Sequence, residues 1–196
     1  MKILALSPHT DDVELGCGGS IVKWIEKGDK VRVVCFSDAD QPNIIEEWQN
    51  SLDILGVKNK QLHLFPRRIF NEKRQEILDL LIREQDLYNP DLVLIPSVHD
   101  IHQDHQVIAQ EGLRAFNDCS IIGYELPWDC KDFKPNMWIE LQSYHYLTKT
   151  EALRQYKSQE KRGYFGGTFI SNWGRFRGGQ INRFLAEAFE VYKWIQ

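Results

Sequence analysis

Two short polar segments of this sequence contain the residue types that bind metal ions and move protons. The first is Pro8–Asp12 (PHTDD), and the second is His99–His105 (HDIHQDH), which holds three of the six histidines. Each segment follows a short apolar run that predicts a buried strand, at 2–6 and at 91–95. Ligands of open α/β sheets bind beyond the carboxyl ends of the strands. We therefore expect the two segments to meet at one edge of a sheet.

Together the two segments offer a ligand set for a catalytic metal ion. Catalytic zinc commonly takes three protein ligands from histidine and carboxylate and keeps one position open. His9, Asp12 and His105 would supply two nitrogens and one oxygen, and their single negative charge would leave the ion a Lewis acid. We expect Zn²⁺, although iron(II) or cobalt(II) would fit the same ligand set.

Three neighbouring residues remain for acid–base chemistry. Asp11 lies beside a ligand and could act as a base on water. His102 lies three residues before His105, which is one turn if a helix begins there. Protonated His102 could then donate to a developing oxyanion or to the leaving amine. Asp104 could cap that helix or hold an adjacent histidine in one tautomer.

A structural interpretation exists for each segment alone. An Asp-Asp pair after a strand is often a turn and a helix cap, and a lone histidine there is usually structural. Two polar clusters converging at one sheet edge are harder to explain by capping. Gly16–Gly19 lacks the spacing of nucleotide-binding motifs, and we interpret its glycines as letting a helix pack closely on the sheet and the metal loop.

The elements that must position these segments alternate along the first two thirds of the chain. We expect strands at 2–6, 30–36, 61–65, 91–95 and 120–126 and helices at 20–28, 44–55, 71–88 and 104–116. This order predicts an α/β, Rossmann-like and mostly parallel sheet with helices on both faces. After about Trp128 the pattern is irregular, with a final helix expected near Gln180–Trp194. We treat residues 1–196 as a single domain.

Composition excludes several classes of function. The net charge of −4 offers no electrostatic footprint for nucleic acid. No run of about 18 apolar residues exists, so we expect no stable membrane insertion. The four cysteines form no CxxC pair, which indicates reduced thiols and a cytoplasmic setting.

The segment PHTDDVELGCGGSI, taken with His102–His105 (HQDH), resembles the LmbE-like, or PIG-L, family of zinc N-deacetylases. The resemblance covers most of the chain. It is looser at Tyr124-Glu125, Lys149, Ser158-Gln159 and Ala186–Phe189.

The resemblance implies a role for each site residue. It makes His9, Asp12 and His105 the metal ligands and Asp11 the general base. It makes His102 the group that polarises the amide carbonyl or protonates the departing amine. A Rossmann-like fold with a variable C-terminal part over the site is also implied, as is removal of the acetyl group from an N-acetylglucosamine-type conjugate.

Some positions depart from the family pattern or leave the substrate open. Thr10 replaces a usual proline, and no arginine stands near 43–45. Arg67 and Arg68 could contact substrate instead, or form a solvated surface pair. Three tryptophans of the second half could line the substrate site or belong to the core: Trp128, Trp138 and Trp173. A homo-oligomer is compatible with the sequence.

Two other functions stay open. A metallophosphoesterase needs more His and Asp ligands, for which Asp38, Asp40 and His99 are available. A non-catalytic nucleotide- or sugar-binding module would keep its ligand affinity when Asp11 is replaced, and it would have no turnover to lose.

Overall fold

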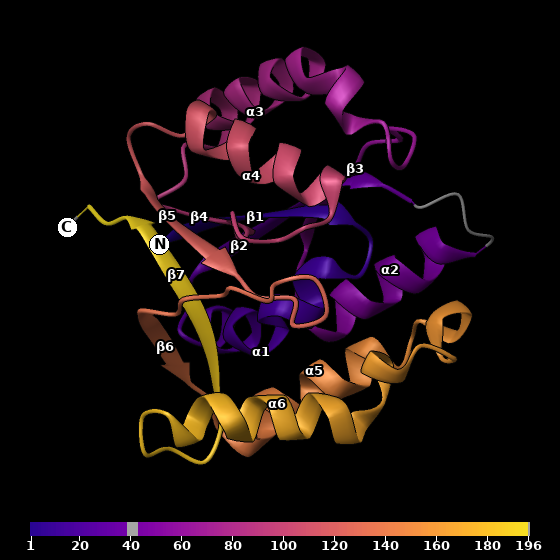
Figure 1. The fold of residues 1–196 in the computed structure, drawn as a ribbon, viewed down its shortest axis with the longest axis vertical. Coiled ribbons are helices and arrows are strands. Elements are labelled where there is room, and N and C mark those ends of the chain that lie inside the picture. The colour runs from indigo at the N-terminus through magenta and orange to yellow at the C-terminus, as the bar shows by residue number, and fades with distance from the viewer. Residues whose placement is uncertain (39–42, 196) are drawn as a thin grey trace.

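The computed structural model describes residues 1–38 and 43–195, which form a sheet of seven strands between layers of helices (Figure 1). The strands are β1 (Lys2–His9), β2 (Lys30–Ser37), β3 (Asn59–Leu62), β4 (Leu92–Pro96), β5 (Ser120–Tyr124), β6 (Met137–Glu140) and β7 (Ala186–Lys193). Their order is β3-β2-β1-β4-β5-β7-β6. The first five pair in parallel, whereas β7 runs antiparallel to both β5 and β6. The expected mostly parallel α/β sheet is confirmed.

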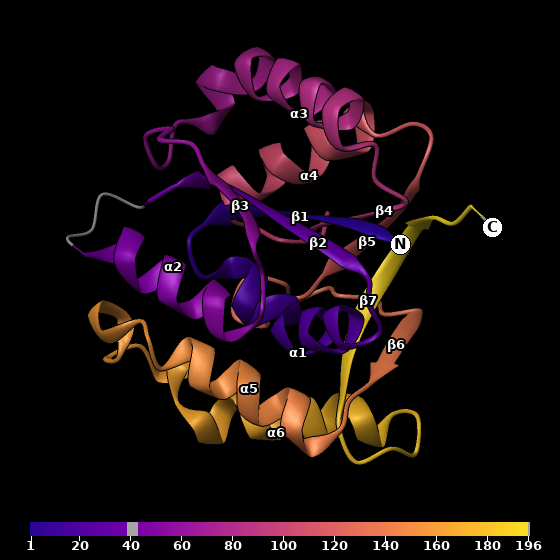
Figure 2. The ribbon, with the colours of Figure 1, turned by 180° about the vertical axis from the view of Figure 1, so that it is seen from behind.

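The helices form layers on both faces of this sheet. They are α1 (Asp12–Glu26), α2 (Ile44–Ile54), α3 (Arg74–Tyr88), α4 (Gln103–Ala115), α5 (Ser143–Leu153) and α6 (Gly167–Gly179), with 3₁₀ turns η1 (Phe70–Lys73), η2 (Lys157–Gln159) and η3 (Gly163–Phe165). Figures 1 and 2 show α3 and α4 on one face and α1 and α2 on the other, with α5 and α6 outside α1 and α2. No helix in the described part of the chain has both the length and the apolar character to cross a bilayer.

Buried strands explain why the apolar runs are continuous rather than alternating. Along β1, Ile3 and Ala5 pack toward α1 and α2, whereas Leu4 and Leu6 pack toward α3 and α4. Successive side chains of a strand point to opposite faces, so a strand covered by helices on both sides must be apolar throughout.

The glycine-rich segment lets α1 approach the sheet closely. A Cβ on Gly16 would lie 2.3 Å from a ring carbon of Tyr124, and one on Gly19 would lie 2.5 Å from Leu141. The helix leaves helical geometry at Cys17 (φ −145°, ψ 18°). The predicted close packing of this helix on the sheet is confirmed; the glycines' contacts are with Tyr124, Lys149, Leu55, Leu141 and Glu187 rather than with the loop at 8–12.

The prediction of a final helix near Gln180–Trp194 is wrong. The helix of this region, α6, ends at Gly179, and residues 186–193 form strand β7 (Figure 1). β7 inserts between β5 and β6, and its Phe189, Val191 and Tyr192 are types that favour strands. Glu187 and Glu190 are buried in β7 and interrupt the apolar pattern of a strand. Their carboxylates are hydrogen-bonded to residues far away in the sequence.

One of these glutamates, Glu187, supports the kink in α1. Its carboxylate accepts hydrogen bonds from the backbone N–H groups of Gly19 (3.0 Å) and Ser20 (2.7 Å). Buried Lys149 donates to it at 2.6 Å. Glu187 therefore satisfies backbone donors that the kink exposes, and Lys149 compensates its charge.

Candidate metal centre

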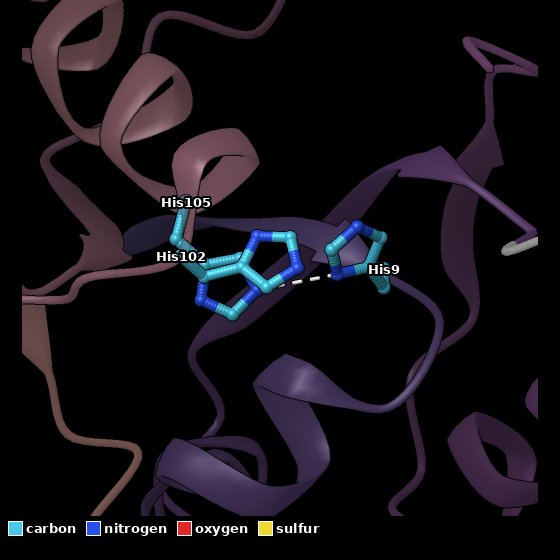
Figure 3. A group of neighbouring side chains, drawn as sticks. All are labelled: His9, His102 and His105. Carbon is cyan, nitrogen blue, oxygen red and sulfur yellow. Dashed lines mark hydrogen bonds between the residues drawn. The ribbon is translucent and has the colours of Figure 1, made fainter. Parts of the chain in front are cut away.

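The two polar segments meet at the carboxyl ends of β1 and β4. His9 is the last residue of β1, and His102–His105 begin α4 just beyond β4. These strands are neighbours, and the strand order reverses beside β1, which is where ligands bind in such sheets. Figure 3 shows the ring of His9 pointing toward those of His102 and His105.

Three donor atoms form a nearly equilateral triangle at this point. His105 Nε2 lies 3.2 Å from His9 Nδ1 and 3.2 Å from Asp12 Oδ2, and His9 Nδ1 lies 3.4 Å from Asp12 Oδ2. Ligands about 2.0–2.1 Å from a tetrahedral zinc ion lie roughly 3.3–3.4 Å apart. The predicted set of His9, Asp12 and His105 therefore fits one divalent cation in both donor type and spacing.

Two buried aspartates orient the histidines of this triangle. Asp104 Oδ2 lies 3.1 Å from His9 Nε2, and Asp100 Oδ2 lies 2.8 Å from His105 Nδ1. Each carboxylate leaves the other ring nitrogen facing Asp12, which is the usual arrangement around a metal-binding histidine. The sequence pattern does not single out Asp100, because the bend that brings it to His105 has no periodic signal.

Asp104 does not cap α4 as one expectation held. His102 occupies the cap position, and its Nδ1 accepts the backbone N–H of Asp104 at 3.2 Å. The Asp104 side chain instead turns toward His9, where its Oδ2 also accepts the Arg68 N–H at 2.7 Å.

The surroundings of His102 favour its neutral ring, whereas the sequence analysis expected a protonated one. Burial, with the charges of His105 and His9, lowers the pKa of His102 to about 4. Because its Nδ1 accepts a hydrogen bond, the proton of the neutral ring lies on Nε2. His102 lines the cavity beside the triangle, so Nε2 is the nitrogen available to a ligand.

A second grouping of histidines needs to be weighed against the triangle. His9, His102 and His105 also place three ring nitrogens within 4.8 Å of one another. We prefer Asp12 to His102 as the third ligand, since its oxygen lies at ligand spacing from both other donors and its charge offsets that of a cation.

The pKa values of the two adjacent aspartates, Asp11 and Asp12, are shifted in opposite directions. Burial alone would raise the pKa of Asp12, but His105 and His9 hold it well below its usual range. Burial raises the pKa of Asp11 to about 6, and the charge of Asp12 adds to the effect. The low pKa of Asp12 suits a metal ligand, which must be ionised, and the raised pKa of Asp11 suits a base, which must take up a proton.

A cavity of ≈ 250 Å³ opens over these residues. Arg67, Arg68, Trp128, Arg162 and Tyr164 line its wall. The two arginines expected either at substrate or in solvent therefore belong to the cavity.

The aromatic part of the wall comes from the irregular second half. Trp128 stacks on Tyr164 with ring centroids 3.9 Å apart, and Trp173 packs edge-on against Trp128 at 6.5 Å. Trp138 lies on β6, where its indole donates to Gln180. Arg162 and Tyr164 lie between η2 and α6, in a stretch without periodicity that gave no sequence signal.

The extra ligands that a metallophosphoesterase would need are not gathered here. Within the described chain the cavity wall includes neither Asp38 nor His99, and His99 pairs with Glu190 at 2.9 Å. Asp40 lies outside the described residues.

Comparison with known proteins identifies the family. The sequence model of the PIG-L family, described as GlcNAc-PI de-N-acetylase, matches residues 4–116, which contain both polar segments. This chain belongs to the PIG-L family. The predicted membership is confirmed, and the PIG-L chain is a hydrolytic N-deacetylase.

Individual relatives agree with this placement. The uncharacterized deacetylase YaiS of Escherichia coli is 30% identical over 172 residues, covering 80% of this PIG-L chain and 90% of YaiS. The diacetylchitobiose deacetylase of Thermococcus kodakarensis is 26% identical over 191 residues, covering 81% of this chain and 70% of that enzyme. The solved zinc-inhibited form of teicoplanin deacetylase Orf2 shares the fold, with a TM-score of 0.83 at 16% identity over 97% of each chain.

Proposed function

We propose that this PIG-L deacetylase is a Zn²⁺-dependent hydrolase that removes the acetyl group from an N-acetylglucosamine-type amino sugar conjugate. The observation that carries the proposal is the triangle of His9, Asp12 and His105 with Asp11 and His102 on the same cavity wall. The related diacetylchitobiose deacetylase supports an N-acetylated sugar as the substrate class.

His9 Nδ1, Asp12 Oδ2 and His105 Nε2 would hold the ion. When bound, Zn²⁺ supplies Lewis acidity and lowers the pKa of water to about 7. Asp100 and Asp104 keep the two histidines in the tautomers that this task requires.

Asp11 is the proposed general base. Its raised pKa lets it accept a proton from the attacking water near neutral pH. The water oxygen then bonds to the amide carbon, the C–N bond breaks, and the proton that Asp11 took from the water passes to the departing nitrogen. The products are acetate and a free amine.

His102 is the proposed donor to the carbonyl oxygen. Its Nδ1 is held by the Asp104 N–H, so Nε2–H is fixed in orientation. A preorganised donor of this kind stabilises negative charge as it develops on that oxygen. The stacked Trp128 and Tyr164 offer apolar surface for the sugar ring.

The test is amine and acetate release from a panel of N-acetylglucosamine glycosides by zinc-loaded protein. We expect equal amounts of the two products, and a rate about 10²- to 10⁴-fold lower for Asp11→Asn at matched zinc content. Release of inorganic phosphate from phosphorylated sugars without amine would favour a phosphoesterase instead. If the parent and Asp11→Asn both bind the sugar and neither forms product, a binding module would be favoured.

A further inference from the structure

In the part of the chain that the structure describes, Arg67 and Arg68 lack the ion pairs that several other arginines of the fold form. Arg32 pairs with Glu84, Arg74 with Glu111, and Arg177 with Glu125. Across residues 1–38 and 43–195, no carboxylate forms an ion pair with the guanidinium of Arg67 or Arg68. Both residues line the cavity that contains the metal triangle. Two guanidinium groups at a ligand cavity are therefore available to a ligand.

The backbone at Arg68 is tied to the metal centre. Arg68 has φ 70°, a left-handed conformation that non-glycine residues rarely adopt. Its N–H donates to Asp104 Oδ2 at 2.7 Å, and its carbonyl accepts from the Gln103 side chain. The same Asp104 oxygen contacts His9. Such strain persists where surrounding contacts fix it, and it is common at ligand sites.

The charge of the cavity contrasts with that of the chain. Three arginines line the wall together with Asp11, Asp12 and Asp129, so a bound divalent cation would give these lining residues a net positive charge. Asp100 and Asp104 are buried behind the two histidines. The chain as a whole carries −4. Arg162 lies 3.9 Å from Asp11, whereas among the described residues no carboxylate pairs with the guanidinium of Arg67 or Arg68. A positive cavity in an acidic protein selects anionic ligands.

Building on the proposed deacetylase function, we infer that the substrate conjugate carries an acidic group beyond its N-acetylated ring, and that Arg67 and Arg68 bind it. Guanidinium groups match carboxylate and phosphate oxygens in a two-pronged geometry that a neutral sugar hydroxyl does not offer. The two arginines thus determine specificity, whereas the triangle, Asp11 and His102 perform the reaction.

The test compares three glycosides that differ only at the anomeric substituent. They are methyl N-acetylglucosaminide, carboxymethyl N-acetylglucosaminide and N-acetylglucosamine 1-phosphate. The proteins are the zinc-loaded parent, Arg67→Gln, R67Q/R68Q and Arg83→Gln. Arg83 is exposed on α3 outside the cavity, so its replacement removes a positive charge without altering the wall. Arg67→Gln leaves the tethered backbone of Arg68 unchanged and guards against misfolding of the double variant.

The measured quantity is the ratio of kcat/KM for each anionic glycoside to that for the methyl glycoside. We expect the parent to prefer at least one anionic glycoside by tenfold or more. The double variant should lower this ratio about 10- to 100-fold, mainly through KM, and Arg83→Gln should retain it. The responding glycoside distinguishes a carboxylate from a phosphate. Equal rates on all three glycosides, or equal losses in the double variant, would overturn the inference.

If the proposed deacetylase function is wrong, the experiment gives a result that differs from failure of the inference about Arg67 and Arg68. Absence of acetate from every glycoside would reject deacetylation of these sugars. Calorimetric binding of the same glycosides to zinc-loaded Asp11→Asn then decides the inference on its own. Tighter binding of an anionic glycoside that R67Q/R68Q abolishes would support it, and equal or absent binding would overturn it.

Discussion

Asp104 Oδ2 lies 3.1 Å from His9 Nε2, joining residues 95 positions apart at the centre of the site. This contact turns the other nitrogen of His9 toward Asp12 and His105. Since the same oxygen accepts the Arg68 N–H, Asp104 connects His9 with the backbone of Arg68 in the cavity wall. Of the two roles that the sequence offered Asp104, a helix cap or a partner of a histidine, this contact agrees with the second.

Replacing Asp104 with alanine should weaken metal binding. Removal of a carboxylate that orients a ligating histidine typically costs about 10- to 100-fold in metal affinity or activity. Zinc affinity can be measured by competition with a chromophoric chelator. Asp53→Ala, which removes an exposed carboxylate on α2, is the control. An Asp104→Ala protein that binds zinc within threefold of the parent would show that His9 needs no such support.

Replacing His102 with alanine should separate catalysis from metal binding. Loss of one oxyanion donor lowers kcat about 10²- to 10³-fold, while the zinc content should stay at the parent level. Elemental analysis and kcat are measured on the same preparation. Zinc lost together with activity would instead assign His102 as a ligand with His9 and His105.

Replacing Gly16 with alanine should destabilise the fold. Its Cβ would meet the Tyr124 ring at 2.3 Å, and overpacking of this kind costs about 1–3 kcal/mol in the free energy of unfolding. Gly179→Ala is the matched control, because a Cβ there meets no atom within 4 Å. The urea concentration at the unfolding midpoint is measured for both variants. Equal midpoints would contradict the close packing of α1 on β5.

Glu190 should make stability fall in acid. Burial alone would raise the pKa of Glu190, but hydrogen bonds from Ser97, Tyr192 and the Lys134 N–H, with the charge of His99, lower it below the usual value of 4.5. A group with a lowered folded pKa stabilises the protein above its unfolded pKa and loses that contribution as the pH falls through its folded pKa.

The measurement is the free energy of unfolding of Glu190→Gln and the parent between about pH 3 and pH 6. The variant should be less stable than the parent at pH 6, and the difference should shrink as the pH falls through the folded pKa. Tyr192→Phe, which removes one donor to Glu190, should give a smaller change of the same sign. A difference that stays constant with pH would contradict the assignment.

The sheet and the convergence of PHTDD with HQDH could be predicted because they depend on local patterns. Continuous apolar runs mark the buried parallel strands, and parallel strands bring their carboxyl ends to one edge. The alternation of strand and helix predicts that the first five strands pair in parallel, whereas their order is seen only in the structure.

The second half could not be predicted in the same way. β7 carries Glu187 and Glu190 in buried positions, and their partners come from α1, α5 and the loop after β4. Asp100 and Arg162 likewise reach the site through bends that no periodicity records. Contacts of this kind arise from the tertiary fold, so the local sequence around these residues does not predict them.

The central claim is that His9, Asp12 and His105 hold one zinc ion that deacetylation requires. Zinc content and acetate release should be measured together on the parent, on metal-stripped and reconstituted parent, and on Asp12→Ala. We expect about one zinc per chain, acetate release that is lost on stripping and restored by zinc, and neither zinc nor activity in Asp12→Ala. Acetate released at the parent rate by the metal-free protein, or one zinc retained by Asp12→Ala, would contradict the account.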